Sequence, residues 1–191
     1  MLYARALILN KQYADADKIL SKIEVLPNEG ATMGRQLYRE AKLMLALKEM
    51  KAGKCSKALQ YISDSRQWPE RLGSGKPYDA DIDTRLEDWM NYKCFVKIRN
   101  TNGAKQMLDN IIAYSLNIKI EGRPSVNNLI SALALKQAGR GGEAEKLLND
   151  VSSAHASNKI AEWTRAAYNG NASKLDVESN EDYEILQQLL D

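Results

Sequence analysis

The chain has 191 residues, with 27 basic and 25 acidic side chains and a net charge of +2. This length predicts one domain or two, and the near balance of charge excludes the large basic surface that nucleic-acid binding would need. No apolar run reaches the roughly 20 residues of a membrane span, and the N-terminus lacks the basic start and cleavage site of a signal peptide. We therefore expect a cytoplasmic location by default, or a periplasmic one if the chain is part of a longer protein.

The composition predicts an all-α fold. Helix-forming residues dominate, whereas strand-length runs of β-branched residues are missing. An interior proline costs a helix about 3 kcal/mol, and each of the four prolines lies between predicted helices, at Pro27, Pro69, Pro77 and Pro124. Thr84 and Glu87 have the spacing of a capping box at one helix start, and residues 118–120 are typical of an extended stretch.

Four alanines mark a repeated helical hairpin. Each is followed four residues later by leucine or isoleucine on the same helix face. Five residues before two of the alanines lies a glycine, which suits a helix end in the left-handed backbone conformation, whereas Lys11 and Arg99 depart from this pattern. The turn positions and their alanines are Lys11 and Ala16, Gly53 and Ala58, Arg99 and Ala104, and Gly139 and Ala144. Twelve residues before the alanine, three of the four hairpins carry another small residue, where two helices would cross closely.

This arrangement resembles the tetratricopeptide repeat, and the resemblance covers residues 1 to about 152. It implies repeats at about 1–26, 32–65, 84–117 and 125–152, with a degenerate capping hairpin at 157–191. The alanines lie 40 to 46 residues apart, against about 34 in a standard repeat, so the surplus should fall between hairpins. The implied fold is an all-α, right-handed superhelix of four to five helical hairpins, in a single domain over 1–191.

The segment 68–77 carries a second resemblance. It reads WPERLGSGKP and is similar to a stretch in a bacterial family of tetratricopeptide proteins, whose repeats follow β-rich domains in carbohydrate-utilisation contexts. The resemblance implies that these helices are the structural tail of a larger carbohydrate-active or sugar-binding protein, with its chemistry outside this chain. The first residues read as the middle of a helix, which favours the same interpretation.

The first helices of the resembled family line a concave groove that binds peptides. Trp89, Lys93 and Lys97 recur every four residues on one such predicted helix, and Arg5 and Lys136 would occupy related places on others. Cations around an aromatic ring could bind an acidic peptide or a chain terminus. The alternative, which we favour for these residues, is that Trp89 packs under the 68–77 loop while the lysines are solvated.

We expect no enzyme, cofactor or metal site. His155 is the only histidine, and no nucleophile or second histidine can be paired with it from the sequence. The aspartates at 79, 81 and 83 open a calcium-loop pattern, but the required glycine and glutamate are missing. The glycine-rich run at 73–76 lacks the spacing of a phosphate-binding loop. Leucines replace the polar residues of the family's chaperone-binding clamp, at Leu43, Leu47, Leu129 and Leu133.

The sequence therefore favours a non-catalytic scaffold that binds a protein or peptide, and the structural tail of a larger protein is the alternative. It identifies neither the partner nor the oligomeric state.

Overall fold

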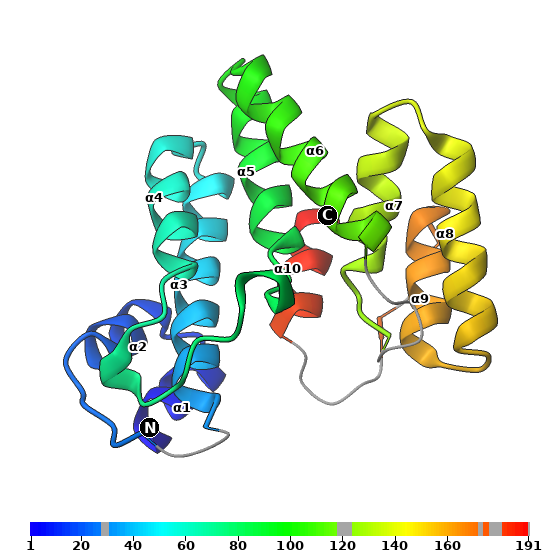
Figure 1. Ribbon diagram of the computed structural model, residues 1–191. Coiled ribbons are helices and arrows are strands. Elements are labelled where there is room, and N and C mark those ends of the chain that lie inside the picture. Colours follow the sequence, from blue (N-terminus) through cyan, green and yellow to red (C-terminus); the bar gives the residue numbers. More distant parts are fainter. Residues whose placement is uncertain (28–30, 118–123, 172–173, 176–180, 191) are drawn as a thin grey trace. The chain divides into compact units, whose positions relative to one another are not determined.

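The computed structural model describes residues 1–27, 31–117, 124–171, 174–175 and 181–190. Ten α-helices and two short 3-10 helices lie within these ranges, and no β-strand is found there (Figure 1). The all-α prediction is confirmed. The predicted extended stretch at 118–120 lies outside the described residues.

The chain divides into two compact units, Met1–Ile82 and Asp83–Asp191. The helices of the first unit are α1 (Leu2–Leu9), α2 (Tyr13–Leu20), α3 (Met33–Lys51) and α4 (Cys55–Ser65), followed by the 3-10 helices Glu70–Leu72 and Asp79–Asp81. Those of the second unit are α5 (Arg85–Lys97), α6 (Thr101–Asn117), α7 (Asn128–Gln137), α8 (Gly141–Ala154), α9 (Lys159–Tyr168) and α10 (Glu181–Leu190). A single repeat domain that includes both units stays a prediction.

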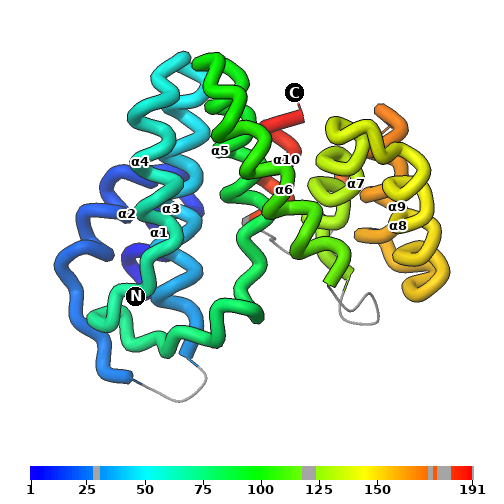
Figure 2. Tube along the Cα trace, turned by 45° about the horizontal axis from the view of Figure 1, so that its top comes forward, coloured from blue at the N-terminus to red at the C-terminus, as the bar shows by residue number. Residues whose placement is uncertain are grey.

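Within each unit the helices pack in a regular order. Consecutive helices form the pairs α1–α2, α3–α4, α5–α6 and α7–α8, and each pair lies in one of the predicted repeats. The first helices of neighbouring pairs also contact each other: α1 contacts α3, and α7 contacts both α5 and α9. The second helices α2, α6 and α8 each pack on the next first helix (Figure 2).

A left-handed residue closes the turn after each first helix. The five residues, with φ between 59° and 77°, are Lys11, Gly53, Arg99, Gly139 and Gly170. In every case the N–H of the left-handed residue donates to the carbonyl three residues before it. The N–H of the following residue donates to the carbonyl five residues before that residue, and all these distances are 2.8–3.1 Å. This is the Schellman pattern of a helix C-terminus. The left-handed turn expected at Gly53 and Gly139 is thus confirmed, and Lys11 and Arg99, which depart from the glycine pattern, adopt the same conformation.

The alanines that mark the repeat lie in the core. Ala16, Ala58 and Ala144 are fully buried, and Ala104 is nearly so. The small residues of the first helices are buried as well, at Ala4, Ala46 and Ala132. Three of the four hairpins therefore bury a small side chain on each of their two helices, and small side chains allow close approach.

The 68–77 segment folds back onto the first unit. Leu72 belongs to the core formed by α1, α2 and α3, and the Arg35 guanidinium lies 4.6 Å from the centre of the Trp68 ring. A Cβ atom on Gly34 would lie 2.5 Å from the Leu72 carbonyl oxygen, so glycine permits this close approach. The glycine-rich run thus ends a tight turn that packs Leu72 against the helices.

The left-handed turns predict that Lys11→Gly and Arg99→Gly will each stabilise the protein. The left-handed conformation costs a residue with a side chain about 1–2 kcal/mol, and glycine removes this cost. Glycine also raises the conformational entropy of the unfolded chain, which offsets part of the stabilisation. We expect the free energy of unfolding, measured by urea denaturation, to rise by about 0.5–1 kcal/mol.

The matched control is Gly139→Ala, where the added methyl group would meet open space. It should lower the free energy of unfolding by about 1 kcal/mol through the backbone conformation alone. If all three variants match the parent, the turns do not limit stability.

Candidate functional site

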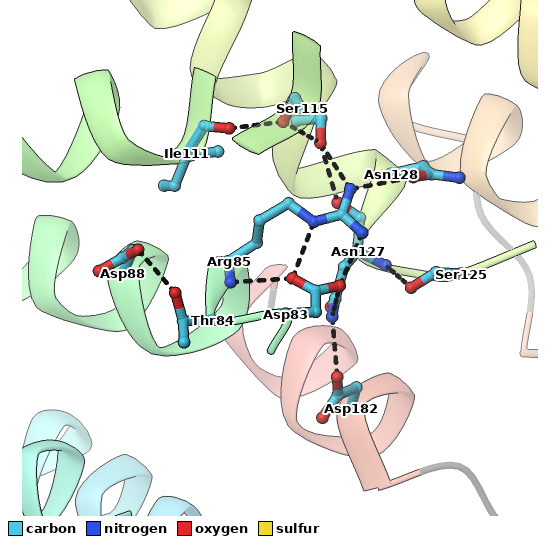
Figure 3. Close-up of polar contacts among 11 residues, drawn as sticks. Asp83, Thr84, Arg85, Asp88, Ile111, Ser115, Ser125, Asn127, Asn128 and Asp182 are labelled. Atoms are coloured by element: carbon cyan, nitrogen blue, oxygen red, sulfur yellow. Dashed lines mark hydrogen bonds and ion pairs between the residues drawn. The ribbon is translucent and has the colours of Figure 1, made fainter. Parts of the chain in front are cut away.

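Arg85, the first residue of α5, is 1% exposed and lies at the centre of a polar cluster in the second unit. Its Nε and Nη2 atoms donate to the two carboxylate oxygens of Asp83 at 2.9 and 2.7 Å (Figure 3). Its Nη1 atom donates to Asn128 Oδ1 at 3.0 Å and to Ser131 Oγ at 2.8 Å. The Tyr114 ring centre lies 5.1 Å from the guanidinium carbon. The paired hydrogen bonds and the amide and hydroxyl acceptors offset the cost of burying this charge.

The cluster joins three helices of the second unit. The Ser115 hydroxyl of α6 lies 2.6 Å from each of two acceptors, Ser131 Oγ of α7 and the Ile111 carbonyl oxygen (Figure 3). Because Arg85 begins α5, these contacts fix the start of α5 against α6 and α7. Sequence reasoning missed Arg85, although a cation in the first turn of a helix opposes the helix dipole and could have signalled a special role.

Asp83 is held by charge and by hydrogen bonds. Burial acts to raise the pKa of the Asp83 carboxyl, but hydrogen bonds and the charge of Arg85 outweigh burial and hold that pKa below its usual value. Asn127 Nδ2 also donates to Asp83, at 3.2 Å. The last aspartate of the calcium-like pattern thus binds a guanidinium, and the described part of the chain contains no group of three or more His, Cys, Asp or Glu residues that could hold a metal ion.

The side-chain cap that the capping-box spacing predicts for Thr84 is not formed. Thr84 is the N-cap but makes no side-chain cap, and its hydroxyl instead lies 3.3 Å from a carboxylate oxygen of Asp88. Asp83, one residue earlier, accepts the hydrogen bond from the Arg85 backbone N–H at 3.1 Å. The carboxylate that pairs with the Arg85 guanidinium therefore also accepts a hydrogen bond from the first backbone N–H of α5.

The polar cluster continues into α10. Asn127, the N-cap of α7, donates from Nδ2 to Asp182 Oδ2 at 2.8 Å, near the beginning of α10 (Figure 3). Near the end of α10, Lys93 Nζ of α5 donates to the Leu189 carbonyl at 2.9 Å. These two contacts place both ends of α10 against the first helices.

Between its ends, α10 contacts α9. The Trp163 ring of α9 meets the Tyr183 ring edge-on, with ring centres 5.1 Å apart. Figures 1 and 2 both show α10 between α5 on one side and α7 and α9 on the other. We call Lys93, Asn127 and Trp163 together the α10-binding face.

The helix that lies on this face is amphipathic. Four apolar side chains of α10 are buried, namely Tyr183, Ile185, Leu186 and Leu189. Glu184 is exposed. The Tyr183 hydroxyl also accepts a hydrogen bond from the Leu175 backbone N–H at 2.7 Å. Residues three and four apart share one side of a helix, so the buried set forms a single apolar stripe.

Of the predicted binding residues, the structure brings Trp89 and Lys93 together on α5. The Trp89 ring is 4% exposed and stacks on Tyr92 with centres 5.0 Å apart. Lys93 Nζ lies 6.0 Å from the centre of the Trp89 ring, and burial lowers the pKa of the Lys93 ammonium. Trp89 is therefore a core residue, and Lys93 is half-buried beneath the end of α10.

The other predicted binding residues lie elsewhere. Lys97 is exposed near the end of α5, and Arg5 is exposed on α1 of the first unit. Lys136 is exposed on α7, with Nζ 5.1 Å from the centre of the Tyr168 ring. A binding role for these residues stays a prediction.

The first unit has a charged cluster of its own. Lys42 Nζ of α3 lies 3.1 Å from Asp17 of α2 and 3.3 Å from Asp64 of α4. Burial acts to lower the pKa of Lys42, but hydrogen bonding to Asp17, together with the nearby negative groups, raises it overall. The ammonium already occupies the position between the two carboxylates, so we interpret this cluster as a tie between three helices.

No protein-family model, curated protein or solved structure matches this chain. Within the described ranges, none of the helices is both long and apolar enough to cross a membrane. The assignment of function therefore depends on the geometry of the α10-binding face and of the Arg85 cluster.

The Arg85 cluster predicts that Arg85→Met will strongly destabilise the protein. The change leaves the Asp83 carboxylate without its main partner, and we expect a loss of about 3 kcal/mol, the lower end for a broken buried ion pair, because Asp83 keeps 27% side-chain exposure. Arg85→Lys should recover little, since one ammonium cannot make the parallel pair of hydrogen bonds. The exposed Lys97→Met on the same helix is the control.

The loss should depend on pH. The folded pKa of Asp83 lies below its unfolded value, so its contribution is present above the unfolded pKa of about 3.9 and is lost as pH falls through the folded pKa. The gap in unfolding free energy between parent and Arg85→Met should thus be widest near pH 7 and narrower at pH 3. An equal gap in urea denaturation at both pH values would contradict this account of the pair.

Proposed function

We propose that the chain is a tetratricopeptide-like, right-handed superhelix and a non-catalytic scaffold that binds a protein or peptide through the inner face of its first helices. The packing order supports this proposal. First helices contact first helices, and each of α2, α6 and α8 packs on the next first helix, as expected where stacked hairpins share a core.

The seating of α10 is the observation that carries the binding proposal. A helix of the same chain lies on Lys93, Asn127 and Trp163, which come from α5, the start of α7 and α9. Side chains from three successive first helices thus surround one amphipathic helix. Such helix-in-groove binding is a common mode of peptide recognition.

The charge on α5 favours an acidic partner. Among the described residues, the hydrogen-bond partner of Lys93 Nζ is a carbonyl oxygen, and no carboxylate forms an ion pair with it. Lys97, one helical turn further on, is exposed. A half-buried ammonium and a nearby exposed one favour a partner segment that carries a carboxylate.

We expect the tagged full-length chain to capture a protein partner from native lysate, and the Lys93→Glu/Lys97→Glu variant to lose it. The matched control is Lys105→Glu/Lys146→Glu, which makes the same charge change at exposed positions of the second helices α6 and α8. Circular dichroism should show equal helicity for all three proteins.

Capture that both double variants lose equally would indicate a general charge effect and contradict binding through α5. Capture of no partner by the parent chain would count against the scaffold itself.

A second candidate function, the structural tail of a larger carbohydrate-active or sugar-binding protein, is supported by the outer face of α1. Leu2 is 78% exposed. Met44 of α3 and Ile130 of α7 are the residues that correspond to Leu2 in their own hairpins, and both are buried. In these two cases the second helix of the preceding hairpin packs on the helix, α2 on α3 and α6 on α7. Tyr3 and Leu9 are exposed beside Leu2, and exposed apolar patches of this kind mark interaction surfaces.

The reading frame upstream of Met1 discriminates between the two candidates. A long β-rich region in frame with these helices would support the structural tail. A start codon at Met1 after a stop codon would leave the scaffold as the better account.

A further inference from the structure

We infer that α10 is a displaceable internal ligand: the α10-binding face takes an amphipathic helix of a partner protein, and α10 competes for the same place. The partner helix would carry an acidic residue in its first turn, an apolar stripe matching that of α10, and a carboxylate at its C-terminal end. This inference rests on the proposed function and names the class of partner.

The two polar contacts of α10 recognise general features of a helix. Lys93 binds the carbonyl of Leu189, and the last carbonyls of any helix lack intrahelical partners and carry partial negative charge. Asn127 binds a carboxylate at the opposite end, on Asp182. Seven residues separate the two contacts, about 10 Å at 1.5 Å per residue, so the face selects a helix of at least about two turns.

The apolar contacts add specificity to this recognition. The stripe of Tyr183, Ile185, Leu186 and Leu189 is buried, and Trp163 contacts the Tyr183 ring edge-on. An aromatic residue directly after the acidic one should therefore be preferred in a partner helix.

Asn127, one residue of the face, is held in place without α10. Asn127 donates to Asp83 as well as to Asp182, and Asp83 is paired with the buried Arg85 guanidinium. If α10 leaves, Asn127 keeps its bond to Asp83 and stays oriented toward the incoming helix. The hydrogen bonds of Arg85 itself go to Asp83, Asn128 and Ser131, which all lie outside α10.

The contacts of α10 leave room for a better ligand. In the described part of the chain, Lys93 Nζ donates its hydrogen bond to a neutral carbonyl oxygen, at a position where a carboxylate could form an ion pair. A helix as short as α10, which spans Glu181–Leu190, is also marginal in water without its packing partners. A longer partner helix, which is more stable before it binds, would thus compete with α10 for the same face.

The test uses full-length protein and a fluorescein-labelled peptide with the α10 sequence, EDYEILQQLL, and follows binding by fluorescence anisotropy. In the parent chain, docked α10 reduces the apparent affinity by the fraction of open molecules. Leu186→Ala weakens only the docking of α10, so the peptide should bind this variant at least tenfold more tightly than the parent. Glu184→Ala, an exposed change on the same helix, should match the parent.

A change on the face should have the opposite sign. Adding Lys93→Met to Leu186→Ala should weaken peptide binding several-fold. The peptide with a free C-terminal carboxylate should bind Leu186→Ala more tightly than its C-terminal amide, and this difference should vanish in the Lys93→Met background.

Equal peptide binding by parent and Leu186→Ala, or no binding by a Leu186→Ala protein of parental helicity, would overturn the inference. If Leu186→Ala proves unfolded, Asp182→Ala decides, because it removes the hydrogen bond to Asn127 and leaves the apolar stripe of α10 intact; it should bind the peptide a few-fold more tightly than the parent, and equal binding would overturn the inference.

The outcomes also separate this inference from the proposed function. If a lysate partner is captured in a way that depends on Lys93 and Lys97, but the peptide does not exchange with α10, the inference is contradicted and the scaffold proposal is retained. Peptide exchange without any captured partner would retain the exchangeable helix and count against the scaffold.

Discussion

The hairpins of this protein depend on one backbone constraint, a left-handed residue directly after each first helix. Five such residues, from Lys11 to Gly170, make the same pair of hydrogen bonds back into the helix that they end. The turn reverses the chain within a few residues, so the second helix returns along the first in each pair. The buried alanine five residues later, as at Ala58 or Ala144, then lets the two helices approach closely. The repeat is therefore primarily a repeat of turn geometry, which a cationic residue can adopt at an energetic cost.

The second unit adds a polar constraint to this apolar packing. Arg85 is almost fully buried, and a guanidinium in that position must keep its partners because a missing one leaves an uncompensated charge. Its bonds to Asp83, Asn128 and Ser131 fix α5 against α7, and through Asn127 they orient the amide that receives Asp182. The surface under α10 is thus preorganised by the same cluster that holds the helices together.

A protein that presents an apolar face to a partner has to manage that face when no partner is bound. In our proposal the apolar stripe of α10 covers this face, and Lys93 and Asn127 contact the two ends of the covering helix. A large uncovered apolar surface promotes association, so the covering helix of our proposal would keep the binding face out of water between encounters. In our proposal the cost is a lower apparent affinity for the partner, and the energy of docking α10 sets the size of that cost.

Local pattern in the sequence predicted the helices, the left-handed turns at Gly53 and Gly139 and the buried alanines, because these depend on residues close together in the chain. It also singled out Trp89 and Lys93, which share one face of α5, but could not tell a core tryptophan from an exposed one. Tertiary structure alone decided that Arg85 reaches Ser131 and that α10 returns to Lys93, nearly a hundred residues away. Such contacts leave no periodic signal, because long-range pairing is set by how the hairpins stack. The sequence by itself thus determined the all-α fold and its turns, and the stacking decided which charges are buried and which surface is covered.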